Sequence, residues 1–229
     1  MPHVNNSRLK SQDPVKSYIR ILAPLVLLGC GAPALAQVYQ YPAARPLQWF
    51  IDGGASITQG RTADFLDSGW SIGTGFTLRP VPGQPFMLRA DLNYSRFNAT
   101  NQLISLGQAV NQTPVDNGYG QTVTAFLNGV LEAPVSAWTR FYVTGGLGAG
   151  YRRIELTQNG FLCDPFFCGP GFVSNTVASQ DTTRFAWNAG VGVDFALPGG
   201  QSWFVEARYE RIETQEPTEY IPIRFGFRF

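Results

Sequence analysis

Acids and arginines are the side chains of this sequence that could perform chemistry, because its single histidine, His3, lies next to the amino terminus. Glu206 and Glu210 are four positions apart, so in an extended strand both carboxylates lie on one face, where they could act as general acid and base. Arg208 lies between them on that face. Because arginine pairs readily with carboxylates, we expect these side chains to form ion pairs rather than to transfer protons.

The first 36 residues are typical of a secretory signal peptide. A basic stretch precedes an apolar core from Ile21 to Gly29, and small residues follow. The core is far shorter than the roughly 20 residues that a membrane-spanning helix needs. We therefore expect residues 1–36 to be removed during export.

Cleavage is expected between Ala36 and Gln37, directly after an Ala-Leu-Ala sequence. An alternative is lipid attachment at Cys30, because the residues before it resemble those that precede a lipid-modified cysteine. After cleavage, residues 37–46 would form a short periplasmic segment and residues 47–229 a single folded domain.

Removal of residues 1–36 would leave a nearly neutral chain without histidine. Four of the 17 basic and one of the 16 acidic residues lie in that segment, so a net charge of about −2 remains. This balance gives no basic surface for nucleic acid. Hydrolases with a histidine-activated serine are excluded as well, and no residue pattern predicts a metal or another cofactor.

Two cysteines, Cys163 and Cys168, remain in the exported chain within the sequence Cys-Asp-Pro-Phe-Phe-Cys. Close cysteine pairs in exported proteins commonly form disulfides, and no histidine lies nearby to complete a metal site. We expect a disulfide that closes a loop tip, with two free thiols as the alternative.

Apolar and polar residues alternate in eight segments of about ten to fifteen residues, longer than ordinary soluble strands and long enough to cross a bilayer at a tilt. Period-two alternation is typical of strands with one apolar and one polar face. The pattern predicts an all-β fold, an eight-stranded antiparallel up-and-down transmembrane β-barrel. The segments are Leu47–Thr58, Gly69–Arg79, Phe86–Ser95, Tyr119–Glu132, Arg140–Arg152, Thr183–Leu197, Ser202–Arg211 and Tyr220–Phe229.

The two faces of these segments differ in charge. The residues assigned to the apolar face, from Trp49 to Tyr209 and from Ile221 to Phe229, are uncharged, whereas the opposite face combines glycines with acids and arginines. We expect the charged residues to fill the barrel interior as ion pairs, because an isolated charge in a confined space is costly. The expected lumen residues are Asp52, Arg79, Arg89, Asp91, Glu132, Arg152, Arg184, Asp194, Glu206, Arg208, Glu210, Arg224 and Arg228.

A soluble β-sandwich would show the same alternation, so further features must decide between the two folds. Aromatic residues gather at both ends of the apolar face, as they do at the two interfaces of a membrane. Connections alternate in length, since residues 96–118 and 153–182 are long whereas residues 80–85 and 133–139 are short. These features favour a membrane barrel with short periplasmic turns and long outer loops.

Several stretches resemble one known family. Phe141–Tyr151 and Phe185–Phe195 look like the later strands of small outer-membrane barrels of the OmpA, OmpX and opacity type, and Ile223–Phe229 resembles their carboxy-terminal assembly signal. The resemblance implies an outer-membrane location and recognition by the barrel assembly machinery. The recognised residues would be Phe225, Phe227 and Phe229.

We therefore expect a non-enzymatic outer-membrane surface barrel that contributes to envelope integrity and, through its long outer loops, to adhesion. The alternative is a narrow channel for small polar solutes, because glycines in a mixed-charge lumen could leave gaps. Expected partners are outer-membrane lipid, lipopolysaccharide and the assembly machinery, and the barrel is expected to be a monomer. Aromatic residues that could bind a host or surface ligand, or pack on one another, are Phe161, Phe166, Phe167 and Phe172.

Overall fold

The computed structural model describes residues 46–81, 83–111, 115–164 and 167–229. For Asn111 and for residues 159–164 and 167–175 it describes the backbone alone. The expected signal peptide, its cleavage site at Ala36 and Gln37, and Cys30 lie outside the described residues.

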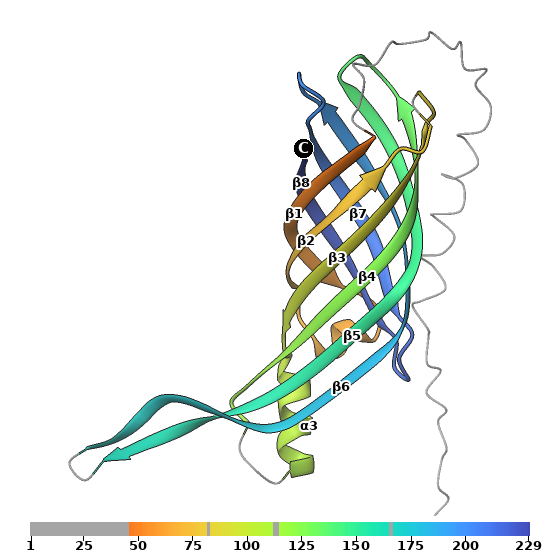
Figure 1. The fold of residues 1–229 in the computed structure, drawn as a ribbon. Helices are drawn as coiled ribbons and strands as arrows, with labels where there is room; N and C mark the ends of the chain where they lie inside the picture. Colours follow the sequence, from red (N-terminus) through yellow and green to blue (C-terminus); the bar gives the residue numbers. More distant parts are fainter. Residues whose placement is uncertain (1–45, 82, 112–114, 165–166) are drawn as a thin grey trace, which may run out of the picture. The chain divides into compact units, whose positions relative to one another are not determined.

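Eight antiparallel strands form a closed ring in which each strand is hydrogen-bonded to its sequence neighbours and β1 is bonded to β8 (Figure 1). The predicted fold is thereby confirmed. The strands are β1 (Leu47–Thr58), β2 (Gly69–Leu78), β3 (Phe86–Asn98), β4 (Asn117–Pro134), β5 (Thr139–Asp164), β6 (Phe167–Ala196), β7 (Ser202–Ile212) and β8 (Thr218–Arg228).

The ring closes between the first and last strands. Asp52 of β1 lies opposite Gly226 of β8 in the register. Beyond the end of β8, the amides of Trp49 and Phe229 each donate a hydrogen bond to the other residue's carbonyl oxygen, at 3.1 and 2.9 Å. Closure leaves no strand edge inside the bilayer, where lipid could not satisfy the backbone groups.

The two faces of the strands are those that the alternation predicts. Large apolar side chains such as Trp49, Leu127 and Phe225 are exposed on the outside of the barrel, whereas Asp91, Glu206 and other charged side chains are buried inside. An apolar exterior with a polar interior suits hydrocarbon outside the barrel and is the reverse of a soluble sandwich.

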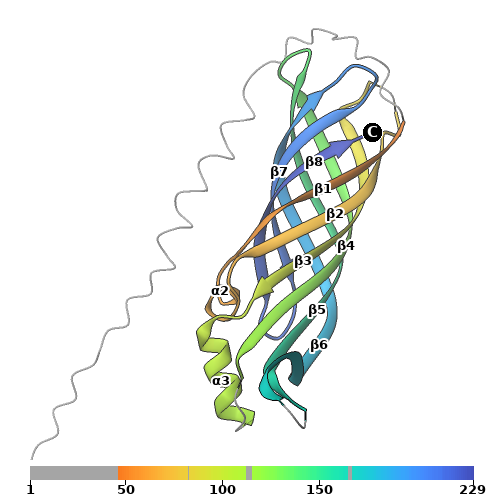
Figure 2. The same cartoon turned by 90° about the vertical axis from the view of Figure 1, so that its left-hand side faces the viewer.

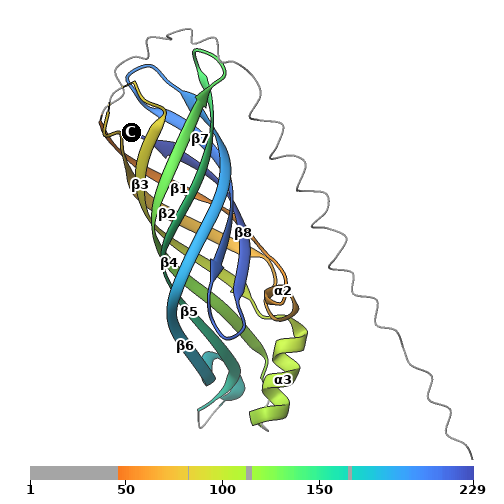
Figure 3. The same cartoon turned by 90° about the vertical axis from the view of Figure 1, so that its right-hand side faces the viewer.

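The two ends of the barrel differ. Residues 79–85, 135–138 and 197–201 form short connections at one end, which we call the short-turn end and which also holds the carboxy terminus. The opposite end, the long-loop end, carries the helices α2 (Thr62–Phe65) and α3 (Asn101–Asn111) and the tip of the β5–β6 hairpin (Figures 2 and 3). Among the described residues no helix is both long and apolar enough to cross a bilayer.

The stretch 153–182 is not the long loop that we expected. Strands β5 and β6 continue pairing beyond the barrel wall as far as Asp164 and Phe167, so most of the stretch is a projecting two-stranded ribbon (Figure 1). The physical reason is that the two strands satisfy each other's backbone groups there although β4 and β7 have ended. Gly169, Pro170 and Gly171 interrupt the alternation from which a strand would be predicted.

The stretch 96–118 also differs from the expected loop, because it contains α3. Thr100 caps this helix, since the Leu103 amide donates to its hydroxyl oxygen (3.3 Å). Leu103 packs against the cluster of Leu66, Phe97 and Tyr220 at the long-loop end of the lumen. A capping threonine followed by Leu103, Leu106 and Val110 at helical spacing is a signal from which this helix could have been predicted.

Several glycines of the inner face make room for aromatic rings of neighbouring strands. A Cβ atom on Gly192 would lie 2.3 Å from Cζ of Tyr142, and one on Gly226 would lie 2.2 Å from Cζ of Phe204. At these two positions the rings occupy the space that the alternative of a narrow channel would need. The glycines therefore serve packing in a narrow interior.

Gly192→Ala should destabilise the barrel by about 1–3 kcal/mol, because the new methyl group overlaps the Tyr142 ring. Gly129→Ala is the matched control, since its Cβ would have only the Phe86 ring nearby, at 3.6 Å. Urea unfolding of both variants in detergent micelles measures the difference. Equal stability of the two variants would contradict the packing role of Gly192.

Candidate functional site

Two reciprocal ion pairs cross the lumen between β3 and β7, which lie on opposite walls of the eight-stranded ring. Arg89 of β3 donates to Glu206 of β7 at 2.7 Å, and Arg208 of β7 donates to Asp91 of β3 at 2.9 Å. All four side chains are at most 1% exposed. Each wall thus supplies one acid and one base, and the two ion pairs connect the walls across the lumen.

The remaining members of this central network lie on β1, β7 and β8. Arg224 donates to Glu210 at 2.8 Å, and Glu210 also accepts a hydrogen bond from the Tyr220 hydroxyl at 2.9 Å. Asp52 lies farther from its cations, at 3.7 Å from Arg224 and 3.9 Å from Arg89. Every carboxylate of this network thus lies within 4 Å of a guanidinium.

A second ionic cluster fills the lumen at the short-turn end. Asp194 accepts hydrogen bonds from Arg140 (2.5 Å) and Arg228 (2.9 Å), and Glu132 accepts one from Arg79 (2.6 Å). Our sequence analysis missed Arg140. Its position, two residues before the inward Tyr142, would have revealed it, because residues two apart share a face of a strand.

An apolar layer lies between the central network and the second ionic cluster. It consists of the buried side chains of Phe50, Met87, Val130, Tyr142 and Phe204, which the sequence analysis also missed. The guanidinium of Arg89 lies 4.4 Å from the centre of the Phe50 ring, so this layer also contacts the central network. In this part of the lumen the apolar layer therefore lies between two layers of charged side chains.

Arg152 and Arg184 differ from the other expected lumen residues, because neither forms an ion pair within the described residues. Arg152 donates to the Thr218 hydroxyl at 2.8 Å and to the carbonyl oxygen of Glu216 at 3.4 Å. Arg184 is exposed on β6. The reason is that β1 and β2 stand opposite β5 and β6 in the ring, and Asp52 is the only acid in these two strands.

A different set of charges lies on the outside of the barrel at the long-loop end. Glu213 accepts hydrogen bonds from the indole of Trp187 (3.0 Å) and from Arg211 (3.3 Å), and these bonds hold the pKa of Glu213 below its usual range. Arg211 also pairs with Glu219 at 2.8 Å. Arg211 thus has two carboxylate partners.

The expected disulfide and aromatic cluster lie at the tip of the β5–β6 hairpin. Cys163 and Cys168 are direct partners in the backbone register, and directly paired Cα atoms of antiparallel strands are close enough for a disulfide. Phe166 lies outside the described residues. The backbones of Phe161, Phe167 and Phe172 belong to β5 and β6, while their side chains are not among those described.

The aromatic residues of the expected assembly signal line the outer surface of β8. Phe225 stacks on Trp203 with ring centres 4.9 Å apart, and Phe227 and Phe229 stack at 6.2 Å. Within the described residues no group of His, Cys, Asp and Glu is arranged to hold a metal ion.

Arg208→Met should cost about 3–5 kcal/mol of unfolding free energy, because Asp91 and Glu206 would lose a shared buried partner. The matched control is Arg211→Met, which removes a partly exposed arginine from the same strand and should cost at most about 1 kcal/mol. Both values come from urea unfolding in detergent micelles. If Arg208→Met left the barrel as stable as the wild type, the network would contribute no net stability.

Solved structures with the same architecture share little sequence with this chain. Neisserial surface protein A (NspA) is 13% identical, with a TM-score of 0.50 over 80% of this chain and 96% of that protein. A major outer membrane protein of Thermus thermophilus is 12% identical, with a TM-score of 0.49 over 81% of this chain and 99% of that protein. Ail of Yersinia pestis, crystallised with the heparin analogue sucrose octasulfate, is 13% identical, with a TM-score of 0.46 over 81% of this chain and all of that protein.

No curated protein matches the chain. The family model described as "Outer membrane protein beta-barrel domain" matches residues 22–229. This match covers every strand of the ring and the layered lumen inside it. The chain therefore belongs to the outer membrane protein beta-barrel domain family.

Proposed function

We propose that the protein is a non-enzymatic surface barrel that supports the integrity of the outer membrane and presents the β5–β6 hairpin as an adhesive element. The observation that carries the proposal is the filled lumen, in which Arg89–Glu206 and Arg208–Asp91 connect opposite walls. A barrel closed in this way acts through its outer surface and its long-loop end. The exported form would begin at Gln37, with the long-loop end facing outward.

The hairpin supports the adhesive part of the proposal. Strands β5 and β6 extend well beyond the other strands (Figure 1). The predicted disulfide between Cys163 and Cys168 would hold its tip in one conformation and lower the entropy lost on binding. Loops that a rigid scaffold positions in this way commonly carry binding functions.

A shortened hairpin separates the two parts of the proposed function. In the variant, an Asn-Gly turn replaces residues 159–174, so that Gln158 and Asn175 join through a two-residue hairpin connection. Cells that lack the protein should become more permeable to hydrophobic dyes. Both the full chain and the shortened chain should restore the barrier, but only the full chain should restore attachment to host-cell or abiotic surfaces.

Two outcomes of this experiment would oppose the proposal. Unchanged permeability in cells without the protein would contradict the envelope role. Full attachment by the shortened chain would contradict the adhesive role of the hairpin. A shift in gel mobility on heating checks in each case that the barrel has folded.

The alternative function, a narrow channel for small polar solutes, requires a continuous path through the lumen. The apolar layer and the cross-wall ion pairs oppose such a path. The purified protein should therefore give no reproducible conductance steps in planar bilayers. Stable steps that change size in an Arg89→Ala variant would instead establish the channel.

A further inference from the structure

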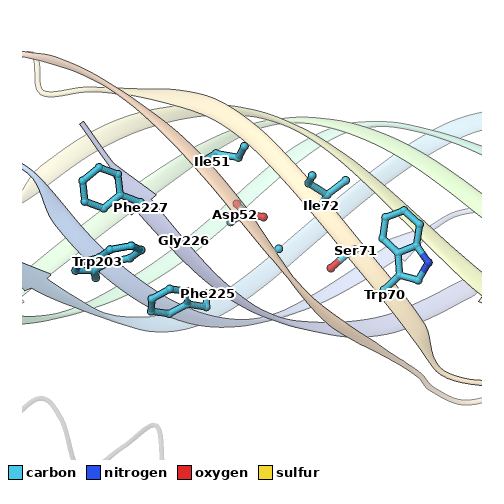
Figure 4. Close-up of a pocket in the computed structure, with 10 residues that line it drawn as sticks. Ile51, Asp52, Trp70, Ser71, Ile72, Trp203, Phe225, Gly226 and Phe227 are labelled. Carbon is cyan, nitrogen blue, oxygen red and sulfur yellow. The ribbon is translucent and has the colours of Figure 1, made fainter.

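A depression in the outer wall of the barrel crosses β1 at the height of Gly53. Its apolar lining consists of Ile51, Trp70, Ile72, Trp203, Phe225 and Phe227, and these side chains surround it in Figure 4. The depression arises because Gly53 lies directly between Ile72 of β2 and Phe225 of β8 in the register. A glycine flanked by two large side chains leaves a furrow about one strand wide.

The size of the furrow suits a hydrocarbon chain. The strands on its two sides, β2 and β8, are two interstrand spacings apart, which is about 10 Å. The flanking side chains occupy part of this width. A helix with side chains is about 10–12 Å across and would not enter. Along β1 the furrow extends from Ile51, the register partner of Phe227, to Ala55, the register partner of Trp70. Four residues of a strand span about 13 Å.

One end of the furrow leads to an arginine. Trp70 is the register partner of Arg96, and the same outward row continues through Gln121 to Arg153. This row lies one step beyond the apolar row that includes Ile72, Tyr94 and Val123, so its arginines stand at the edge of the apolar band.

Arg96 differs from the other outward-facing arginines of the strands. Arg153 pairs with Glu155, and Arg211 pairs with Glu213 and Glu219. Arg96 is exposed and lies with its guanidinium 4.4 Å from the centre of the Tyr119 ring. In the part of the chain that the structure describes, Arg96 has no carboxylate partner, so its hydrogen-bond donors can bind an external anion.

We propose that the furrow over Gly53 and the guanidinium of Arg96 together bind one lipid with a phosphate-bearing headgroup, in the leaflet that meets the long-loop end. One acyl chain lies between Ile72 and Phe225, and the headgroup phosphate contacts Arg96 beside Trp70. Guanidinium groups bind phosphate through charge-assisted hydrogen bonds, which explains the choice of headgroup. Lipid binding at this site is measured on the purified barrel, so the proposal can be tested independently of the envelope role.

The test is native mass spectrometry of the full exported chain in detergent micelles, with bisphosphorylated lipid A and the same lipid after removal of its phosphates. The wild type should retain one phosphorylated lipid and bind the dephosphorylated lipid about tenfold more weakly. Arg96→Gln should weaken binding of the phosphorylated lipid about five- to tenfold and leave binding of the dephosphorylated lipid unchanged. Arg96→Lys, which keeps the charge, should stay within about threefold of the wild type.

The furrow is tested by Gly53→Leu, which fills it and should weaken binding of both lipids about tenfold. A Cβ atom on Gly53 would approach only the carbonyl oxygen of Ser71, at 3.4 Å, so the barrel should tolerate the change. The matched controls are Gly129→Leu, which adds the same side chain at another wall glycine, and Arg211→Gln, which removes an arginine with two carboxylate partners. Both controls should bind like the wild type.

The proposal is overturned if Arg96→Gln or Gly53→Leu binds lipid no more weakly than its control. It is also overturned if the dephosphorylated lipid binds as tightly as the phosphorylated one, or if millimolar inorganic phosphate alone displaces the lipid. A mobility shift on heating confirms that each variant is folded, and Gly53→Val replaces Gly53→Leu if the larger side chain prevents folding.

Discussion

The absence of hydrogen-bonding partners in lipid is the constraint on which this structure depends. Every amide and carbonyl of a strand inside the bilayer must find its partner on another strand, so the sheet has to close. Pairing of β1 with β8, completed by the two hydrogen bonds between Trp49 and Phe229, meets this requirement. The apolar exterior and the polar interior both follow from closure, because one face of each strand then meets hydrocarbon and the other does not.

Closure with eight strands also determines what the interior can be. A ring of this size leaves space for side chains but little else. The protein fills that space with the central network, the second ionic cluster and the apolar layer between them. Inner glycines such as Gly192 and Gly226 make room for the rings of neighbouring strands. Burial makes each unpaired charge costly, so acids and bases occur together and connect opposite walls. The same features that stabilise the barrel thus oppose a passage through it.

Freedom to acquire specific functions is confined to the long-loop end and the lipid-facing surface. At the long-loop end, β5 and β6 continue as a ribbon whose pairing is independent of the ring, and α3 packs beside the mouth. On the lipid-facing surface, Gly53 opens a furrow between large apolar side chains, and Arg96 is exposed without a carboxylate partner among the described residues. Changes at both places leave the closed ring of hydrogen bonds intact, so they can vary without loss of the fold.

Local alternation along the chain determined the number of strands, their order and the inward position of the charged residues, because a strand places successive side chains on opposite faces. Most of the strand boundaries followed from the same pattern. Because residues two apart share a face of a strand, the pattern would also have placed Arg140 and Phe50 inside. The extent of the β5–β6 ribbon could not be read in this way, because pairing outside the membrane depends on two strands meeting each other and not on a buried face.

Only the tertiary structure decided which residues meet across the barrel. Alternation shows that Arg89 and Glu206 point inward, but their 2.7 Å contact depends on strand stagger and on the curvature of the closed ring. The same holds for Arg152 and Arg184, which share the inward parity and yet lie at a height where no acid faces them. A sequence pattern records the face on which a side chain lies, whereas the ring sets its height and its partner.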